Sequence, residues 1–378
     1  MNFSYWEQQE YFTEVDVAIV GSGIVGLFAA IELKTCMPKL KILVLERGVL
    51  PNGASTKNAG FACFGSISEI LDDLESTPEN EVFALIEKRW RGLHKLRQTI
   101  GDEALHFEDS GGYEVFDDET TFEKCTSKID YFNKNLETII GEKVYEPADE
   151  KIKKFGFQKV KHLIFNRFEG QINTGRMMKA LLRKASSLDI DVLNGIETLS
   201  LQPSGKNVYV VLKGGFILKA SRVIVATNAF AKELLPELPL VPGRGQVLVT
   251  SPIPNLQIQG AFHYDKGYYY FRNIDNRILL GGGRNIDFKT EETTTFGLTE
   301  VIQSKLTHLL REMILPNKQY SIDYRWSGIM GFGKEIAPIV KKTYGNIYCA
   351  VKLQGMGVAI GSLVGEEVAN LVLEDYSA

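Results

Sequence analysis

The sequence predicts an α/β protein with two sheets, one parallel and flanked by helices and the other largely antiparallel. Each is assembled from segments that lie far apart in the chain. Uninterrupted apolar strands at residues 16–21, 41–46, 222–229 and 346–351 predict the parallel sheet, because strands covered on both faces need no alternation. Alternating strands between residues 242 and 284 predict an antiparallel sheet with one exposed face.

Three glycines follow the first strand: Gly21, Gly23 and Gly26 have the G-x-G-x-x-G spacing. An apolar-periodic helix runs from them toward Cys36, and the next strand ends at Glu46, twenty positions after Gly26. A strand, this turn, a helix and an acidic residue in this register are the fingerprint of a dinucleotide site.

Each residue of this fingerprint has a physical reason. Gly21 permits the tight turn, Gly23 lets the backbone approach a pyrophosphate, and Gly26 lets the helix pack closely on the strand. The phosphates then lie at the helix N-terminus, where unpaired amides attract anions. Glu46 can accept hydrogen bonds from ribose hydroxyls, and its charge would repel a 2′-phosphate.

The composition of the 378-residue chain is that of a globular enzyme large enough for two linked domains. The net charge of −4 gives no reason to expect a nucleic-acid partner. The four cysteines are scattered without a C-x-x-C pair, and five histidines occur, so we expect neither a metal site nor disulfides. The N-terminus does not resemble a signal peptide and no apolar run could span a bilayer, so we expect a cytoplasmic protein without an integral membrane segment.

The rest of the chain predicts further helices and strands. Helical patterns occur at Ser68–Ile100, Phe122–Ile140, Asn173–Ala185, Gly297–Glu312 and after Gly361. Short strands are expected at Asp191–Leu193, Val208–Leu212, Phe216–Lys219, Gln246–Thr250, Gly267–Arg272, Arg277–Gly283 and around Trp326. The basic run Lys151–Lys161 could form an anion patch, but such runs are more often solvated faces, and we interpret it so.

The first motif alone fits both FAD and NAD, and later segments separate them. Strand-to-glycine units recur at Ala226 and Gly355, as though several loops line one elongated cofactor. The relevant segments are Gly53–Gly60, Val223–Ala229, Arg244–Thr250, Arg277–Gly283, Trp326–Gly331 and Gly355–Gly361. In order and spacing they resemble the FAD-dependent D-amino acid oxidase-like superfamily, which includes glycine, sarcosine and γ-glutamylputrescine oxidases.

The resemblance implies two domains, both discontinuous in sequence. A Rossmann-like FAD-binding domain would comprise residues 1–80, 158–238 and 335–378. A substrate-binding domain with an antiparallel sheet would comprise residues 81–157 and 239–334.

The resemblance also implies a set of cofactor-binding residues. The pyrophosphate would contact Gly21, Ser22, Gly23, Ile24 and Gly26, and the adenosine end would contact Glu46, Arg47 and the backbone of Thr198, with Ala226 and Thr227 near the phosphates. The ribityl chain and flavin ring would run beside Ser55, Thr56, Asn58, Ala59 and Gly60. The N-terminus of the last helix would be formed by Gln354, Gly355, Met356, Gly357 and Val358, where the helix dipole stabilises negative charge on the reduced flavin.

At the substrate end the sequence departs from several relatives. Met330 stands where glycine oxidases carry an arginine that holds the substrate carboxylate, and Gly355-Met-Gly357 replaces the Gly-His-Gly of sarcosine oxidases. No cysteine for covalent flavin attachment lies near Met330, so we expect noncovalent FAD. The electron acceptor is expected to be O2 or a quinone, and Leu279, which replaces the lysine that sarcosine oxidases use for oxygen activation, is compatible with an acceptor other than O2.

The candidate substrate-binding residues are Tyr268, Tyr270 and Arg272, and the candidate catalytic residues are Met330, Lys352 and Gln354. Tyr268 and Tyr270 would share one face of a strand, although an aromatic core stripe gives the same pattern. Arg272 could clamp an acidic group or form a surface salt bridge. Lys352 is a charge between a buried strand and the flavin loop, which is equally compatible with a pocket role and with a structural one.

The sequence does not decide where two further aromatic side chains lie. We interpret His263 as a surface or core residue and Trp326 as a core residue, and a place in the pocket wall is the alternative for both.

The leading functional hypothesis is an FAD-dependent oxidoreductase that oxidises a small amine or amino acid by hydride transfer to flavin N5, giving an imine. One alternative is a flavin-dependent 2-hydroxyacid or glycerophosphate-type dehydrogenase that passes electrons to a quinone. A nicotinamide-dependent dehydrogenase and a flavoprotein without catalytic activity are further alternatives.

Overall fold

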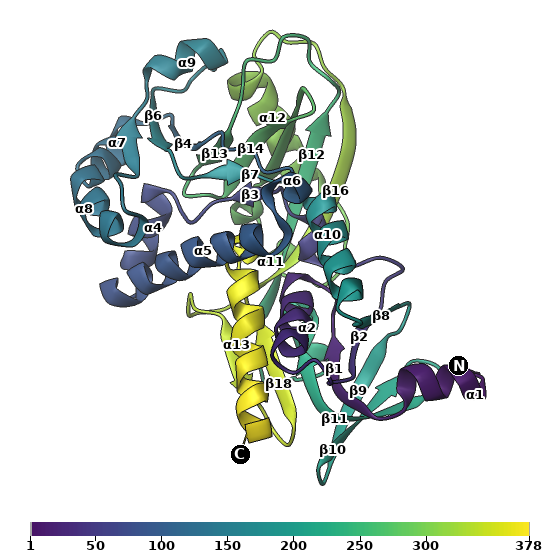
Figure 1. The fold of residues 1–378 in the computed structure, drawn as a ribbon. Coiled ribbons are helices and arrows are strands. Elements are labelled where there is room, and N and C mark those ends of the chain that lie inside the picture. The colour runs from purple at the N-terminus through teal and green to yellow at the C-terminus, as the bar shows by residue number, and fades with distance from the viewer. Residues whose placement is uncertain (1, 378) are drawn as a thin grey trace.

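The computed structural model describes residues 2–377, and these form two lobes that are each organised around one sheet (Figure 1). Strands from early, middle and late parts of the sequence lie side by side in both sheets. The predicted α/β class with two discontinuous sheets is therefore confirmed.

The first sheet has a parallel core. Its strands are β1 (Val15–Val20), β2 (Ile42–Glu46), β8 (Asp191–Asn194), β9 (Thr198–Ser204), β10 (Asn207–Leu212), β11 (Ile217–Val225), β17 (Ile339–Lys342) and β18 (Ile347–Val351). The main path runs β17-β18-β11-β1-β2-β8, and β10 and β9 extend antiparallel from β11. Because β1 pairs in parallel with both β2 and β11, the carboxyl ends of these strands meet at one edge of the sheet.

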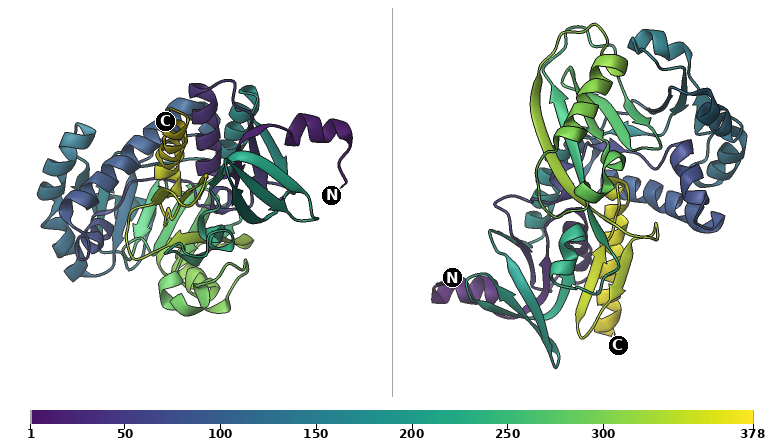
Figure 2. Two further views of the ribbon diagram at one scale, coloured as in Figure 1. Left: turned by 90° about the horizontal axis from the view of Figure 1, so that it is seen from below. Right: turned by 180° about the vertical axis from the view of Figure 1, so that it is seen from behind.

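The helices are α1 (Tyr5–Glu7), α2 (Ile24–Cys36), α3 (Ala54–Lys57), α4 (Ile67–Leu74), α5 (Glu79–Ile100), α6 (Asp102–Leu105), α7 (Glu119–Thr126), α8 (Ile129–Ile140), α9 (Glu150–Phe155), α10 (Thr174–Ser187), α11 (Phe288–Glu291), α12 (Glu300–Leu309) and α13 (Gly357–Ser377). Further helical turns lie at Gln8–Phe12, Asn228–Glu233, Arg284–Ile286 and Leu310–Ile314. Helix α13 packs beside both α2 and α5 (Figures 1 and 2).

Small residues bring α2 and α13 into close contact. A β-carbon on Gly365 would lie 2.6 Å from Cβ of Phe28 and 2.7 Å from the carbonyl oxygen of Val25. A β-carbon on Gly361 would lie 2.8 Å from Cγ2 of Ile24. The contact therefore fixes the N-termini of both helices relative to each other.

The second sheet is mostly antiparallel. It contains β4 (Gly112–Phe116), β5 (Tyr145–Pro147), β6 (His162–Asn166), β12 (Val241–Thr250), β13 (Ala261–Tyr264), β14 (Tyr269–Ile274), β15 (Arg277–Gly282) and β16 (Ile322–Phe332), in the order β16-β12-β15-β14-β13-β4-β6-β5. Strands β13 and β4 pair in parallel. A separate short ladder joins β3 (Phe61–Ala62) to β7 (Gly170–Gln171).

The two faces of the second sheet have different partners. One face packs an aromatic core, in which the rings of Phe262 and Phe271 stack at 4.6 Å and Leu306 of α12 is fully buried. On the other face Val247 and Leu279 pack with Ala59, which belongs to the loop after β2. This face therefore meets the first lobe.

Some predicted elements differ from the structure. The helical pattern at Ser68–Ile100 is divided into α4 and α5, because Pro78 has extended backbone angles and lacks the amide that would continue the helix. The pattern at Phe122–Ile140 is likewise divided into α7 and α8. Tyr268 lies in the turn before β14 and not on the strand, so it does not share a strand face with Tyr270.

Other features bear on the expected organisation. Strand β6 belongs to the second sheet, whereas the proposed domain division places residues 158–238 with the first. The basic run forms α9 and the following loop, and its residues Lys153, Lys154 and Lys159 are exposed.

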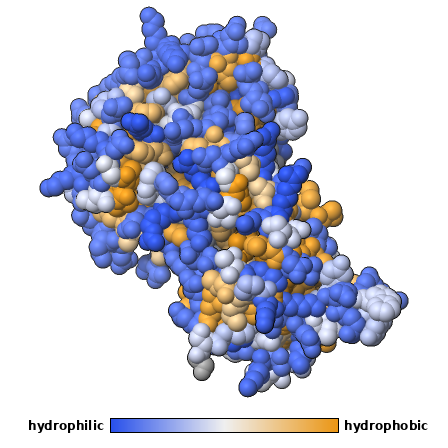
Figure 3. Space-filling view, in the orientation of Figure 1, coloured by the Kyte–Doolittle hydropathy of each residue, from blue (hydrophilic) through white to orange (hydrophobic). Residues whose placement is uncertain are grey.

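Within residues 2–377 no helix is long and apolar enough to cross a bilayer. In Figure 3 the visible face is largely hydrophilic, and hydrophobic side chains gather toward the junction of the two lobes.

We predict that Gly365→Ala lowers the free energy of unfolding by about 2 kcal/mol, because the added methyl group overpacks the contact between α2 and α13. Urea denaturation followed by circular dichroism measures this. Gly175→Ala is the matched control, since Gly175 lies exposed in α10 and alanine there should stabilise the protein by about 0.5–1 kcal/mol. Equal stabilities of the two variants would contradict the close helix contact.

Candidate active site

One elongated cavity lies at the carboxyl ends of β1, β2 and β11 and extends to the second sheet. In open α/β sheets this edge is where ligands bind. The predicted site residues that line it are Gly21, Gly23, Ile24, Glu46, Arg47, Ser55, Asn58, Ala59, Gly60, Thr198, Ala226, Thr227, Tyr270, Met330, Gln354, Gly355, Met356, Gly357 and Val358.

The glycine turn after β1 is closely packed. Gly21 has φ +107°, and a β-carbon there would lie 2.8 Å from the carbonyl oxygen of Ala226. A β-carbon on Gly26 would overlap the carbonyl oxygen of Gly21. These two positions therefore require glycine, which leaves the first amides of α2 close to the cavity.

Glu46 is buried at the end of β2, and both of its oxygens accept hydrogen bonds. Oε2 accepts from the hydroxyl of Ser22 at 2.8 Å and from the Ser22 amide at 3.3 Å. Oε1 accepts from the amide of Gly48 at 2.9 Å. The carboxylate thus holds the glycine turn in place, and the side chain of Ser22 points to Glu46 and not into the cavity.

The same end of the cavity contains two polar atoms without partners. The hydroxyl oxygens of Thr198 and Thr227 are buried and have no hydrogen-bond partner among residues 2–377. Both residues line the cavity, but the oxygens themselves are shielded from it, so a ligand in the cavity would meet these hydroxyls only after rotation of the side chains. Arg47 stacks on Phe230 at 3.9 Å and pairs with Glu233 at 3.2 Å at this rim.

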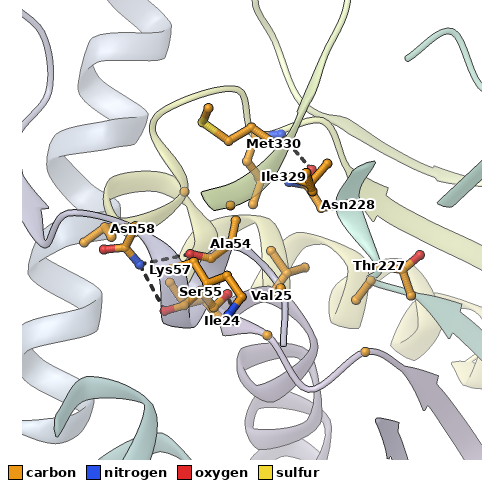
Figure 4. A pocket seen from close by; sticks show the side chains of 18 of the residues that line it. Ile24, Val25, Ala54, Ser55, Lys57, Asn58, Thr227, Asn228, Ile329 and Met330 are labelled. Atoms are coloured by element: carbon orange, nitrogen blue, oxygen red, sulfur yellow. Dashed lines mark hydrogen bonds between the residues drawn. The ribbon is translucent and has the colours of Figure 1, made fainter. Parts of the chain in front are cut away.

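The loop that contains α3 is held by its own polar side chains. Asn58 donates to the carbonyl oxygens of Ala54 and Ser55 at 3.2 and 3.0 Å (Figure 4), and its oxygen accepts from the amide of Gly60 at 2.8 Å. The hydroxyl of Ser55 accepts from the amide of Ile24 at 3.0 Å, at the start of α2. These hydrogen bonds therefore fold the loop on itself and join it to the start of α2.

The N-terminus of α13 also faces the cavity. Gln354 adopts φ +50° and donates from Nε2 to the carbonyl oxygens of Glu335 and Ile336 at 3.2 and 3.1 Å. This conformation precedes the first helical residues, Gly357 and Val358, whose region carries the partial positive charge of the helix.

The end of the cavity opposite Glu46, here called the distal chamber, is lined by Phe61, Glu69, His263, Tyr270 and Met330. The ring of Phe61 lies 5.4 Å from that of His263 and 5.7 Å from that of Tyr270. Burial raises the pKa of Tyr270 to about 12, so its phenol stays protonated at neutral pH. Apart from Glu69 and His263, the chamber is largely apolar.

Six predicted site residues do not line the cavity: Ser22, Gly26, Thr56, Tyr268, Arg272 and Lys352. Thr56 donates to the carbonyl oxygen of Pro51 at 2.7 Å, and Tyr268 packs on Phe288.

Arg272 and Lys352 are the two charged residues among them. The guanidinium of Arg272 donates to the carbonyl oxygens of Gly60 and Ile172 at 2.7 and 2.8 Å, and burial lowers its pKa to about 10. Lys352 is 2% exposed, and burial lowers its pKa. Neither residue lines the cavity. The substrate-binding role of Arg272 and the catalytic role of Lys352 therefore stay predictions.

Sequence reasoning missed the acidic surroundings of His263. Its Nε2 lies 2.8 Å from Oε2 of Glu169 and its Nδ1 lies 3.5 Å from Oε2 of Glu69. Burial lowers the pKa of His263, but the carboxylates of Glu169, Glu69 and Glu114 outweigh this and raise it to about 9. His263 is therefore charged at neutral pH. It is a buried residue that also lines the cavity, as in the alternative interpretation of the sequence.

Cys63 completes this group. Its sulfur, a carboxylate oxygen of Glu169 and a ring nitrogen of His263 lie within 4.8 Å of one another, which is a donor set that could hold a metal ion. A metal would have to displace the direct hydrogen bond between Glu169 and His263. The predicted absence of a metal site therefore stays a prediction.

Comparison with known proteins identifies the family. Residues 16–371 match the family described as FAD dependent oxidoreductase, or DAO. The chain belongs to this family. The resemblance inferred from the sequence is therefore confirmed.

The sequence relatives are distant. The chain is 25% identical to the γ-glutamylputrescine oxidoreductase of Escherichia coli strain K12, covering 95% of this chain and 84% of that protein. It is 24% identical to the bifunctional protein ThiO/ThiG of Synechocystis sp., covering 96% of this chain and 52% of that protein. The chain therefore spans about half the length of this bifunctional relative.

Solved structures share the fold. The crystal structure of glycine oxidase from Bacillus cereus superposes with a TM-score of 0.77, covering 96% of both chains at 16% sequence identity. At this identity the likeness shows the fold alone.

The residues present fit FAD, the cofactor of the family. The turn at Gly21 leaves no room for a side chain, and Thr198 and Thr227, whose hydroxyls have no partner, line the same cavity. The cavity continues past the N-terminus of α13. An elongated dinucleotide matches this combination of an anion-binding helix end, polar atoms and length.

We predict that Thr227→Val weakens FAD binding about tenfold, because it removes a hydroxyl that a bound dinucleotide would satisfy without changing the side-chain shape. Titration of the apoprotein with FAD, followed by flavin fluorescence, gives the dissociation constant.

The matched control is Thr126→Val, since the hydroxyl of Thr126 is also buried without a partner but lies outside the cavity. If both variants bind FAD as tightly as the unaltered protein, Thr227 does not contact the cofactor.

Proposed function

We propose that this protein oxidises a small amine or amino acid to an imine with noncovalently bound FAD. The observation that carries the proposal is the continuity of the cavity from the glycine turn, past the N-terminus of α13, to the distal chamber. Bound flavin would supply the redox chemistry by accepting a hydride from the substrate carbon next to nitrogen. Water would then hydrolyse the imine.

The chain's own residues would bind, orient and shield the reacting groups. Phe61, Tyr270 and Met330 would exclude water from the chamber, and the hydrogen-bonded loop at Asn58 would hold the cofactor against it. The positive end of α13 would stabilise negative charge that develops on the cofactor edge nearest Gly357. The sequence relative named as a γ-glutamylputrescine oxidoreductase supports the reaction class.

The proposal of noncovalent FAD rests on the cysteines. Among the described residues Cys63 is the cysteine that lines the cavity, and burial raises its pKa well above the usual value. It is therefore a neutral thiol, which is a poor nucleophile.

We predict that acid precipitation of the purified protein releases all of its flavin into the supernatant. The absorbance of the supernatant near ~450 nm, compared with that of the native protein, measures the released share, since free oxidised flavin absorbs there. Flavin that stays in the washed pellet of the unaltered protein but is released from Cys63→Ser would show a covalent bond to Cys63.

The reaction itself is tested by reduction of the bound flavin without oxygen. We expect primary or secondary amines, or amino acids, to bleach the flavin absorbance in a stopped-flow spectrometer, while 2-hydroxyacids and glycerol phosphate leave it unchanged. Bleaching by the hydroxy compounds alone would overturn the proposal in favour of a hydroxyacid or glycerophosphate dehydrogenase. Mixing the reduced protein with O2 or with a soluble quinone identifies the faster of the two proposed acceptors.

A further inference from the structure

We infer that the distal chamber recognises a positively charged group, so that the substrate binds as a cationic amine, needs no carboxylate for binding, and must lose one proton from its nitrogen, to Glu69 or to water, before the proposed oxidation. This inference rests on the proposed oxidation of an amine or amino acid and chooses between these two classes. It concerns Glu69, His263 and Glu169, which come from three separate parts of the chain.

Glu69 places a carboxylate on the wall of the chamber. Its Oε2 accepts a hydrogen bond from the amide of Ser66 at 3.0 Å and lies 3.5 Å from Nδ1 of His263. Gly267 packs against its other oxygen, and the side chain is 20% exposed. The carboxylate is therefore fixed in position and remains accessible from the cavity.

His263 carries a positive charge, but two carboxylates face it. Glu169 bonds to Nε2 at 2.8 Å and Glu69 lies near Nδ1, so one imidazolium is set against two negative charges. Glu114 lies behind them and accepts from the amide of Ser68 at 3.2 Å, and burial raises its pKa to about 7. Among Glu69, Glu169 and His263 the carboxylates therefore outnumber the imidazolium, and the nearby guanidinium of Arg89 is paired with Asp73 at 3.9 Å.

Glu169 adds a second carboxylate behind the wall of the chamber. The residue is 1% exposed and does not line the cavity, and its Oε1 is buried without a hydrogen-bond partner in the described chain. Its other oxygen is paired with the imidazolium of His263, so Glu169 offsets the charge of that imidazolium and leaves the carboxylate of Glu69 in excess. The carboxylate of Glu169 lies within 4.8 Å of the Cys63 sulfur, which lines the cavity.

The guanidinium and ammonium groups that could hold a carboxylate point elsewhere, and the imidazolium of His263 already faces the carboxylates of Glu169 and Glu69. The guanidinium of Arg272 is occupied by two backbone carbonyls, and position 330 is a methionine. Of the cavity-lining residues in the described chain, Arg47 lies at the adenosine end. The ammonium of Lys57 lies 5.5 Å from the ring of Phe296, which packs near Phe230 at that same end.

An α-amino acid and an amine would therefore meet this chamber differently. The carboxylate of an amino acid would lie near Glu69 without a free guanidinium to bind it. An ammonium group would be attracted by the excess of carboxylates and could donate to Glu69.

The test measures ligand binding to the oxidised holoenzyme without turnover. The probes are butyltrimethylammonium, hexanoate and hexanamide, which have similar length but positive, negative and no charge; the quaternary nitrogen lacks a lone pair and cannot enter the oxidation. Perturbation of the flavin absorption spectrum gives each dissociation constant. We expect the cation to bind at least about tenfold more tightly than the anion, which corresponds to about 1.4 kcal/mol.

Glu69→Gln should reduce this preference to less than about threefold. Glutamine preserves the capping box with Ser66 at the start of α4, so the fold is expected to persist. Glu75→Gln is the matched control, since Glu75 is exposed at the other end of the same helix and should leave the preference unchanged.

Tighter or equal binding of hexanoate by the unaltered protein overturns the inference, whether or not the variant folds. An unchanged preference in Glu69→Gln overturns the role of Glu69. Failure of the proposed oxidation is separate, because it would be seen as absence of flavin bleaching by every amine and amino acid while the charge preference persists.

Discussion

The architecture of the site depends on one backbone contact, the approach of α2 to the turn that leaves β1. The space at Gly26 is filled by the carbonyl oxygen of Gly21, and Gly21 itself packs against Ala226 at the end of the neighbouring strand. Side chains at these positions would push the helix away from the sheet edge. Because α13 packs on α2 through Gly365, a displacement of α2 would also move the N-terminus of α13. Both helix ends that face the cavity are thus positioned by glycine contacts.

The two lobes contribute different properties to the cavity. The first lobe supplies backbone amides, small residues and the buried carboxylate of Glu46, which are suited to a phosphate-containing cofactor. The second supplies larger side chains, such as Tyr270 and Met330, whose identity varies the shape and charge of the chamber without disturbing the cofactor end. Under the proposed function, cofactor and substrate selectivity would be separated along the length of one cavity.

The position of the glycine turn and of Glu46 at the edge of the first sheet could be predicted from the sequence, because Gly21, Gly26 and Glu46 lie in one short strand–helix–strand unit with a fixed register. Their contacts with a cofactor stay a prediction. The sequence could not predict the pairing of Glu169 with His263, since the two residues are 94 positions apart. Glu169 lies between β6 and β7 and His263 lies on β13, so they meet only in the folded chain. Arg272 illustrates the other limit. Strand alternation gives the face of a side chain, but not the carbonyl groups that a long guanidinium reaches.

The hydrogen bonds of Arg272 have a mechanical consequence. The residue belongs to β14 of the second sheet, whereas its acceptors, Gly60 and Ile172, flank the loop and helix of the first lobe. The indole of Trp326, on β16, donates to the carbonyl oxygen of Lys57 at 2.9 Å and forms a second tie. A hinge motion that separates the two lobes would break all of these hydrogen bonds at once. Entry of a substrate is therefore expected to depend on movements of single side chains, with the two lobes acting as one rigid frame.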